Sequence, residues 1–567
     1  MNAGWICRIA VFLGVLTVCA VYLGGYMARV FSGEKTLLSG LLSRTEHWIY
    51  KFLKINPASG MSWQGYAVAL LVFNLFGVVF LFLLQIVQQA LPLNPQGFGA
   101  VKWDLALNTA ISFVTNTNWQ AYGGESTMSY LTQMLGMTVQ NFLSAATGIA
   151  ASIAVFRGFT ANSAKEIGNF WVDLTRSLLY ILLPLSVIFA VVLGTQGVIQ
   201  NFNPYVKART LEGAEQIIAQ GPAASQTAIK MLGTNGGGFF NANSAHPYEN
   251  PNPLTDWLQI MALLVISAAL PFTFGVMLKT KKQGWAVFTA MMILFLLGLG
   301  FALLAESQGN PILEKLGVHR GVNMEGKEVR FGILSSVFFA QSTTVTSCGA
   351  VNSMHDSFLP LTGLVLLFNM MVGEVIFGGV GSGIIGFLLY AILAMFLVGL
   401  MIGRTPEIFG KKLEPPEMVM AVLAIVLPSV CQLSFSSVAI SIKEGLAALN
   451  NAGPHGLSEI IYAFASGAGN NGSAFAGLNA NTPFYNLTIS VAMIIGRYIT
   501  LVPALAIAGK LAAKKASPPS ARFPTASPLF VLLLVGVIII VGALTFFPAL
   551  ALGPFIEHLA MNAGKTY

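Results

Sequence analysis

Four short patches rich in glycine, asparagine and hydroxyl side chains recur along the chain at near-equal intervals. The patches are Thr115–Gln120, Gly233–Gly238, Thr346–Ala350 and Gly469–Ser473. The residues taken as equivalent within them are Asn118, Gly236, Gly349 and Gly472. These residues are separated by 118, 113 and 123 positions. Near-equal spacing over four copies indicates internal duplication, in which each copy comprises one span, one patch and one span.

The residue types in the patches suit a site that holds an ion with backbone carbonyl groups. Gly adopts positive φ without penalty, and Asn does so more often than most residues. An extended, partly left-handed chain can present carbonyl oxygens that replace the hydration shell of a potassium ion. Four such segments around one axis would form an ion filter. The alternative is four unrelated surface turns, because Gly and Asn also dominate turns; the shared register of four copies favours the filter.

The composition places these patches in a membrane protein. Of the 567 residues, 55% are hydrophobic and 9% are charged, and the mean hydropathy is +0.72. Soluble domains carry about 25% charged residues. The composition therefore excludes a soluble globular protein, a disordered chain and a nucleic-acid-binding protein. The four cysteines show no paired spacing, which argues against a disulfide framework or a zinc site.

Long apolar runs predict an all-α polytopic membrane protein with about ten transmembrane helices. The runs are Ile6–Tyr26, Tyr66–Val87, Tyr130–Phe156, Leu178–Val198, Trp257–Leu278, Trp285–Leu304, Leu359–Ile402, Val419–Ile442, Leu487–Ala508 and Leu529–Leu552. The first run is longer than the apolar region of a secretion signal and lacks a convincing cleavage site, so we expect a retained helix.

Basic residues alternate between connections, which predicts the orientation of the chain. Every second connection is basic, and these connections hold 18 of the 30 Lys and Arg residues. Because Lys and Arg in short loops are retained on the cytoplasmic side, both termini and all four patches are expected to lie outside.

The spans and patches together predict four membrane-pore-membrane repeats around a central ion path, with one extra helix at each end. The expected divisions are an N-terminal helix and cytoplasmic loop at 1–60, repeats at 61–165, 166–282, 283–412 and 413–515, and a linker with a C-terminal helix at 516–567.

Longer motifs around the patches carry a family resemblance. Thr115–Gln120, Leu232–Pro251, Thr343–Ser357 and Ala465–Leu478 resemble the four filter regions of the KdpA family, the potassium-binding subunits of the bacterial Kdp potassium-transporting ATPases. The resemblance runs over essentially the whole chain. The fold it implies is that of the superfamily of potassium transporters built from four membrane-pore-membrane units.

The resemblance also implies a function. Members of this family belong to an ATP-driven, high-affinity potassium uptake complex of the bacterial inner membrane. They take potassium from the periplasm and pass it through an intramembrane path to the P-type ATPase subunit of the Kdp complex, with small accessory subunits and membrane lipid as further partners. No cofactor is implied besides the transported potassium ion.

The chain itself carries no sequence motif for ATP chemistry. It contains no GxxxxGK[ST], HExxH or DKTG motif, so we expect a non-hydrolytic subunit and no membrane-embedded enzyme. A self-sufficient potassium channel or ion-coupled potassium transporter of the same architecture is the alternative function. Only the extended filter motifs favour the complex.

The resemblance assigns filter roles to one set of residues and an affinity role at the filter mouth to Gln120. The filter residues are Thr117, Asn118, Thr234, Asn235, Gly236, Ser347, Cys348, Gly349, Asn470, Asn471 and Gly472. The first patch departs from the glycine pattern at Asn118, which weakens the expected fourfold symmetry of the carbonyl groups.

The run Leu359–Ile402 has 44 residues, about twice the length that a bilayer needs. Its middle contains Gly378, Gly379, Gly381 and Gly383, and each glycine costs a helix about 1 kcal/mol relative to alanine. We therefore expect a helix break below the filter. In the family such a break obstructs the downward path, which would divert the ion; close helix packing is the alternative role for these glycines.

Two charged residues lie at membrane depth near this break, and such residues are usually functional or paired. Arg497 could donate to carbonyl groups freed by the break or repel a cation, while a structural ion pair with Glu374 is an equally open alternative.

The six histidines show no metal-ligand spacing, so no transition-metal site is expected. His355 and Asp356 are expected to cap the helix that follows the third patch.

Overall fold

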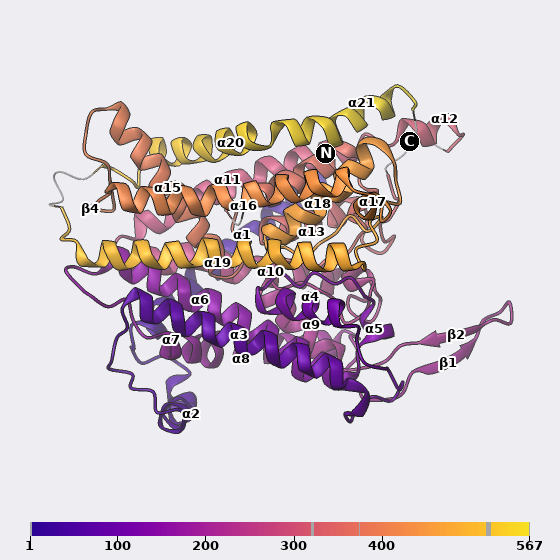
Figure 1. The fold of residues 1–567 in the computed structure, drawn as a ribbon, viewed down its shortest axis with the longest axis horizontal. Coiled ribbons are helices and arrows are strands. Elements are labelled where there is room, and N and C mark those ends of the chain that lie inside the picture. The colour runs from indigo at the N-terminus through magenta and orange to yellow at the C-terminus, as the bar shows by residue number, and fades with distance from the viewer. Residues whose placement is uncertain (1–2, 319–322, 374, 518–522, 566–567) are drawn as a thin grey trace.

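The computed structural model describes residues 3–318, 323–373, 375–517 and 523–565, and it is almost entirely helical (Figure 1). Within these residues, ten helical segments are long and apolar enough to cross a membrane. They are α1 (Ala3–Phe31), α3 with η1 (Trp63–Val87 and Gln88–Ala90), η2 with α6 (Thr132–Thr138 and Val139–Thr160), α7 with η3 and α8 (Phe170–Arg176, Ser177–Leu182 and Leu183–Thr195), α10 (Pro253–Met277), α11 (Lys281–Glu306), α15 (Ser382–Met401), α16 (Pro415–Ser441), α19 (Pro483–Ala513), and α20 with η7 and α21 (Pro528–Leu550, Ala551–Phe555 and Ile556–Asn562). Nine of the predicted apolar runs each overlap one of these segments along most of their length, whereas Leu359–Ile402 contains α15 together with a shorter apolar helix, Pro360–Met371; the all-α class is confirmed.

Four shorter helices lie between spans and are largely buried in the protein. They are α4 (Trp103–Val114), α9 (Ala223–Leu232), α13 (Gly332–Val345) and α18 (Gly453–Ala468). They gather in the right half of Figure 1, and each ends at one of the four patches. With 10 to 16 residues, each is too short to cross a bilayer, since a spanning helix needs about 20.

The long run after the third patch is broken, as the glycines predicted. Helix α14 (Pro360–Met371) ends about ten residues before α15 begins, and Gly373, Phe377, Gly378 and Gly381 between them have positive φ. A helix cannot continue through left-handed residues, so the chain here crosses the protein as two helices joined by irregular backbone. The break is therefore confirmed.

Small residues set how closely the helices pack. Helix α1 lies along α10, and a Cβ atom on Gly24 would be 2.5 Å from the carbonyl oxygen of Ala269.

A buried ion pair joins α6 to α7. Arg157 forms two hydrogen bonds with the carboxylate of Asp173, at 2.6 and 2.8 Å. Tyr66 also donates to Asp173, at 3.1 Å. This buried group ties α3, α6 and α7 together.

Both termini lie in the right half of Figure 1, as do the four short helices. An even number of spans requires the two termini to share a side.

The connections between the longer helices contain further short helices and strands. They are α2 (Ser39–Phe52), α5 (Gly124–Thr127), α12 (Pro311–Lys315), α17 (Lys443–Leu446), η4 (Asn243–Ala245), η5 (His355–Ser357), and the strands β1 (Val206–Arg209), β2 (Glu215–Ile218), β3 (Glu407–Ile408) and β4 (Lys411–Lys412). The strands form two small antiparallel hairpins that the apolar pattern did not predict.

Candidate functional site

The four short helices end in the same way and direct their C-terminal ends at one place. The residue that follows each helix cap has positive φ, between 47° and 64°. These residues are Asn116, Thr234, Ser347 and Asn470. The left-handed residue turns the chain out of the helix, so the following carbonyl groups belong to irregular backbone. Because a helix C-terminus carries partial negative charge, four such ends favour a cation between them.

The backbones of the predicted filter residues approach one another as a closed ring. A Cβ atom on Gly236 would lie 2.1 Å from the nitrogen of Gly349, and one on Gly349 would lie 2.8 Å from the carbonyl carbon of Gly472. A Cβ atom on Gly472 would lie 1.9 Å from the carbonyl oxygen of Thr117. Glycine is required at three positions because each side chain would occupy the space of the next repeat's backbone.

Asn118 closes the ring in the place where the first repeat lacks glycine. Its φ is 54°, so it adopts the left-handed conformation found at Gly236 and Gly472. Its side-chain amide donates to the carbonyl oxygen of Gly236 at 3.0 Å and to Asn141 at 2.7 Å. The departure from glycine therefore adds a cross-repeat hydrogen bond, and one ring carbonyl is engaged by the protein itself.

Asn116 was missing from the residues assigned to the filter, although it occupies the same left-handed position as Thr234. Its amide donates to the carbonyl oxygens of Gly233 and Thr234, at 3.3 and 3.2 Å. Its side-chain oxygen accepts from Asn235 at 2.5 Å and from Ser144 at 2.9 Å. Alignment of the four patches by their first residue after the helix would have identified it.

The other predicted filter residues are buried, and hydrogen bonds within and between repeats hold several of them. Asn470 donates to the hydroxyl of Thr117 at 3.0 Å, which joins the fourth repeat to the first. Asn471 donates to the carbonyl oxygen of Thr343 at 3.0 Å, and the Thr343 hydroxyl donates to the carbonyl oxygen of Cys348 at 2.5 Å. The structure therefore brings all the predicted filter residues together at one site.

Gln120 lies at the edge of a cavity of about 570 Å³ that opens above the ring. Asn118, Gly349 and Gly472 also line this cavity. The Gln120 side chain accepts from the nitrogen of Gly238 at 2.7 Å and donates to the Gly238 carbonyl oxygen at 3.2 Å. It thereby fixes the end of the second patch.

The irregular segment between α14 and α15 passes against the inner side of the ring. The Gly378 N–H donates to the carbonyl oxygen of Val345 at 2.8 Å, and the Val380 N–H donates to the hydroxyl of Thr234 at 2.8 Å. Gly381 has a φ of 89°, and a Cβ atom there would lie 2.0 Å from the carbonyl oxygen of Gly148. The glycines therefore serve both the conformation of the break and its close packing.

Arg497 is buried against this segment. It donates to the hydroxyl of Ser382 at 3.1 Å and to the carbonyl oxygen of Ser144 at 3.1 Å. The arginine thus joins the start of α15 to α6, and the carbonyl it bonds to belongs to α6 and not to the break. Glu374 lies outside the described residues.

Two buried ion pairs beside the filter had no sequence prediction. Lys230, in the last turn of α9, pairs with Glu249 and donates to Asn243 at 2.8 Å. Glu249 also accepts from the nitrogen of Phe240 at 2.8 Å, so it anchors the loop that leaves the second patch. Lys327 pairs with Glu306 at 2.8 Å with both side chains fully buried. The charges were visible in the sequence, but their partners were not.

The predicted helix cap at His355 and Asp356 is wrong. These residues begin the short turn η5, and the cap position of α14 is Leu359, whose nitrogen donates to Glu306 at 3.1 Å. His355 instead bonds to the hydroxyl of Tyr462 at 2.8 Å, and Asp356 bonds to His455 at 3.1 Å. Asp356 therefore pairs with a residue far away in the sequence, His455, and does not cap the helix that follows it.

The fold and the ring define a class of protein: a polytopic membrane protein with four pore segments around a central ion path. The family model described as the potassium-transporting ATPase A subunit matches residues 10–559, and the chain belongs to that family.

Named relatives support this assignment over the full length. The chain is 55% identical over 565 residues to the potassium-transporting ATPase potassium-binding subunit of Brucella anthropi, covering 100% of this chain and 99% of the relative. It is also 55% identical over 568 residues to the subunit of the same name from Solibacter usitatus, covering 100% of both. The solved potassium transporter TrkH from Vibrio parahaemolyticus shares the fold, with a TM-score of 0.54, 16% identity, and coverage of 88% of this chain and 98% of that one.

We predict that Lys230→Met destabilises the protein by about 3–5 kcal/mol, because it leaves the Glu249 carboxylate buried without its cation. Thermal unfolding of the detergent-purified protein measures the change. The double variant Lys230→Met with Glu249→Gln should recover much of the loss. Lys207→Met serves as a control, since its pair with Glu215 is exposed. A melting temperature unchanged by Lys230→Met would show that the pair does not anchor the loop.

Proposed function

We propose that this chain is the non-hydrolytic potassium-binding and filter subunit of an ATP-driven, high-affinity potassium uptake complex. It binds potassium from the periplasm at the ring formed by the four patches. The single observation that carries the proposal is the closed contact of Gly236, Gly349, Gly472 and Thr117, in which backbone from four repeats converges. Family membership supplies the substrate class and the complex.

Potassium suits this ring for a physical reason. A weakly hydrated cation can exchange its water for several carbonyl oxygens when the oxygens are already in place. The cross-repeat hydrogen bonds of Asn118 and Asn470 supply that pre-organisation. The four helix C-termini add a favourable potential for any cation, while the carbonyl ring distinguishes one cation from another.

The break between α14 and α15 is proposed to divert the ion from a direct route through the chain. It bonds to Thr234 of the filter and to the end of α13, so it lies on the path below the ring. The ion would leave sideways toward the P-type ATPase subunit of the Kdp complex, with small accessory subunits and membrane lipid completing the assembly. A filter lowers a barrier but cannot drive an ion uphill, so the partner must supply the energy.

The filter is tested by Gly236→Ala. The new Cβ atom meets the backbone of Gly349 and strains a residue with a φ of 87°, so the ring must open. We expect the apparent potassium affinity of uptake to fall at least tenfold and discrimination against rubidium and ammonium to weaken, measured in a strain without other potassium uptake. Gly300→Ala is the matched control because no atom lies within 4 Å of its added Cβ. Wild-type affinity and selectivity in Gly236→Ala would refute the filter assignment.

Dependence on a partner is tested with the purified chain alone in sealed vesicles. With a proton or sodium gradient supplied, we expect no accumulation of potassium, because the chain carries no motif for ATP chemistry and a filter stores no energy. Isotope or fluorescent-indicator uptake measures the result. Accumulation against the potassium gradient would support the alternative, an ion-coupled transporter that works without an ATPase.

The proposed localisation is the bacterial inner membrane with both termini in the periplasm. We expect Gln308→Cys to react with a membrane-impermeant maleimide in intact cells and Lys282→Cys to react only after permeabilisation, in a background with the four native cysteines replaced. Both positions are exposed at opposite ends of α11. The reverse labelling pattern would invert the topology.

A further inference from the structure

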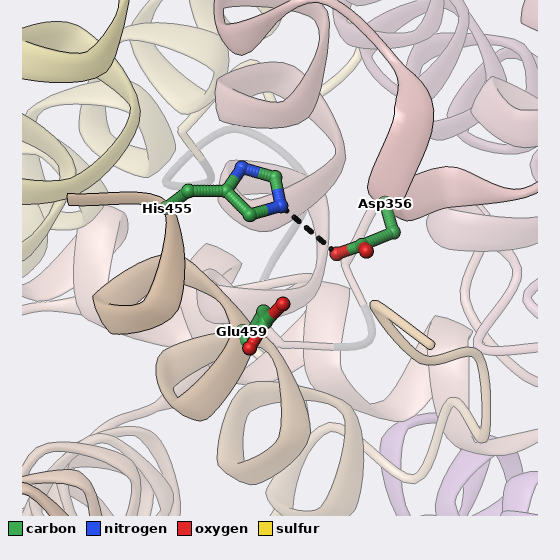
Figure 2. Close-up of side chains that lie close together, drawn as sticks. All are labelled: Asp356, His455 and Glu459. Atoms are coloured by element: carbon green, nitrogen blue, oxygen red, sulfur yellow. Dashed lines mark hydrogen bonds and ion pairs between the residues drawn. The ribbon is translucent and has the colours of Figure 1, made fainter. Parts of the chain in front are cut away.

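A histidine and several carboxylates from separate parts of the chain meet beside the outer end of α18. Figure 2 shows the side chains of Asp356, His455 and Glu459 gathered around one point. One possible ligand atom from each lies within 4.8 Å of the other two. His455 and Glu459 are four residues apart on α18 and therefore share a face of the helix, whereas Asp356 comes from η5, after the third patch.

Glu459 gives the first sign that the group is built to receive a ligand. Its side chain is fully buried, and its Oε1 atom accepts from Asn451 at 2.8 Å. Its Oε2 atom is buried and has no hydrogen-bond partner among the described residues. A buried carboxylate oxygen without a partner is costly, and a bound cation would remove that cost.

The backbone beside the carboxylates gives a second sign. Gly477 lies where an added Cβ atom would be 2.1 Å from Oε1 of Glu459 and 2.7 Å from Oδ2 of Asp356. The absence of a side chain there lets two acidic groups approach one another. Two carboxylates held this close repel each other, and a bound cation would relieve that repulsion.

The imidazole of His455 is already oriented as a ligand. Its Nδ1 atom is 2.8 Å from Oε1 of Glu557, and its Nε2 atom is 3.1 Å from Oδ1 of Asp356. A tetrahedral zinc ion with bonds of about 2.0–2.1 Å separates neighbouring ligands by roughly 3.3 Å. The second distance, which is a hydrogen bond in this structure, is close to that ligand separation, so an ion could replace the proton with little movement of the two groups. Histidine ligands of zinc commonly donate their other nitrogen to a carboxylate, which is the position of Glu557.

We propose that Asp356, His455 and Glu459 form a Zn²⁺-type divalent metal site, with Glu557 orienting His455. Three protein ligands would leave a fourth position for water, and a cavity of about 440 Å³ lined by Asp356, His455 and Glu557 provides access. An imidazole ligand favours zinc over calcium or magnesium, which prefer oxygen ligands alone. Without the metal, the His455 imidazole bonds to both flanking carboxylates.

The ion would join parts of the fold that are remote in sequence. Asp356 follows the third patch, His455 and Glu459 belong to the pore helix of the fourth repeat, and Glu557 lies on α21 near the C-terminus. Tyr462, one turn after Glu459, bonds to His355 and to Ser473 beside the filter, at 2.8 and 2.9 Å. A bound metal would therefore stabilise the outer edge of the third and fourth repeats.

The test uses the complex purified from membranes, stripped with a chelator and then equilibrated with ZnCl₂. We expect one zinc per complex that depends on this site, measured by elemental analysis after dialysis, and a rise of several degrees in melting temperature. Glu459→Gln and His455→Gln should each weaken that binding at least tenfold, and Co²⁺ in the site should give the visible absorption of a tetrahedral complex.

His558→Gln is the matched control, because this histidine is exposed on α21 and bonds to Asn562 outside the cluster. It should bind zinc as the wild type does. The proposal is overturned if the wild type gains no zinc and no thermal stability. It is also overturned if Glu459→Gln and His455→Gln, folded as judged by size-exclusion chromatography, bind zinc as tightly as the wild type. Calcium binding as tight as zinc binding would overturn the assignment to a transition metal.

Discussion

The structure depends on one constraint, which is that every backbone polar group at membrane depth needs a partner within the protein. The four patches and the helix break contain backbone groups that have no helical hydrogen-bond partner, near the centre of the molecule. The surrounding helices bury them, and the patches and the break bond mainly to one another: Asn118 donates to the Gly236 carbonyl, the Thr234 hydroxyl accepts from Val380, and the Val345 carbonyl at the end of α13 accepts from Gly378. Irregular backbone is stable here because the surrounding spans enclose it.

The same constraint explains why the repeats differ in residue type. Three repeats place glycine where the next repeat's backbone leaves no room for a Cβ atom, whereas the first places Asn118 there and uses its amide as a bridge. The four repeats therefore contribute different residues to the ring: three glycines leave room for the neighbouring backbone, and one asparagine bonds to it. The broken helix of the third repeat adds to this asymmetry, because Val380 in the break donates to the hydroxyl of Thr234.

Buried charges hold the outer loops and the break in position. Lys230 in α9 pairs with Glu249 in the loop after the second patch, and Glu306 at the end of α11 pairs with Lys327, which lines the cavity above the ring. Removing one member of such a pair is costly because the other stays charged and desolvated. Arg497 acts below the ring by bonding to Ser382 and Ser144. These residues support the filter without forming it.

The sequence by itself determined the ten spans, the break in Leu359–Ile402 and the four patches, because apolar length and the conformational preferences of Gly and Asn are local properties. Tertiary structure alone decided which side chains meet. It placed Asn116 against Thr234, replaced the expected cap at Asp356 by a bond to His455, and gave Lys230 its partner. Such contacts join residues far apart in the chain, so no local pattern encodes them. Only the packing of the helices brings them together.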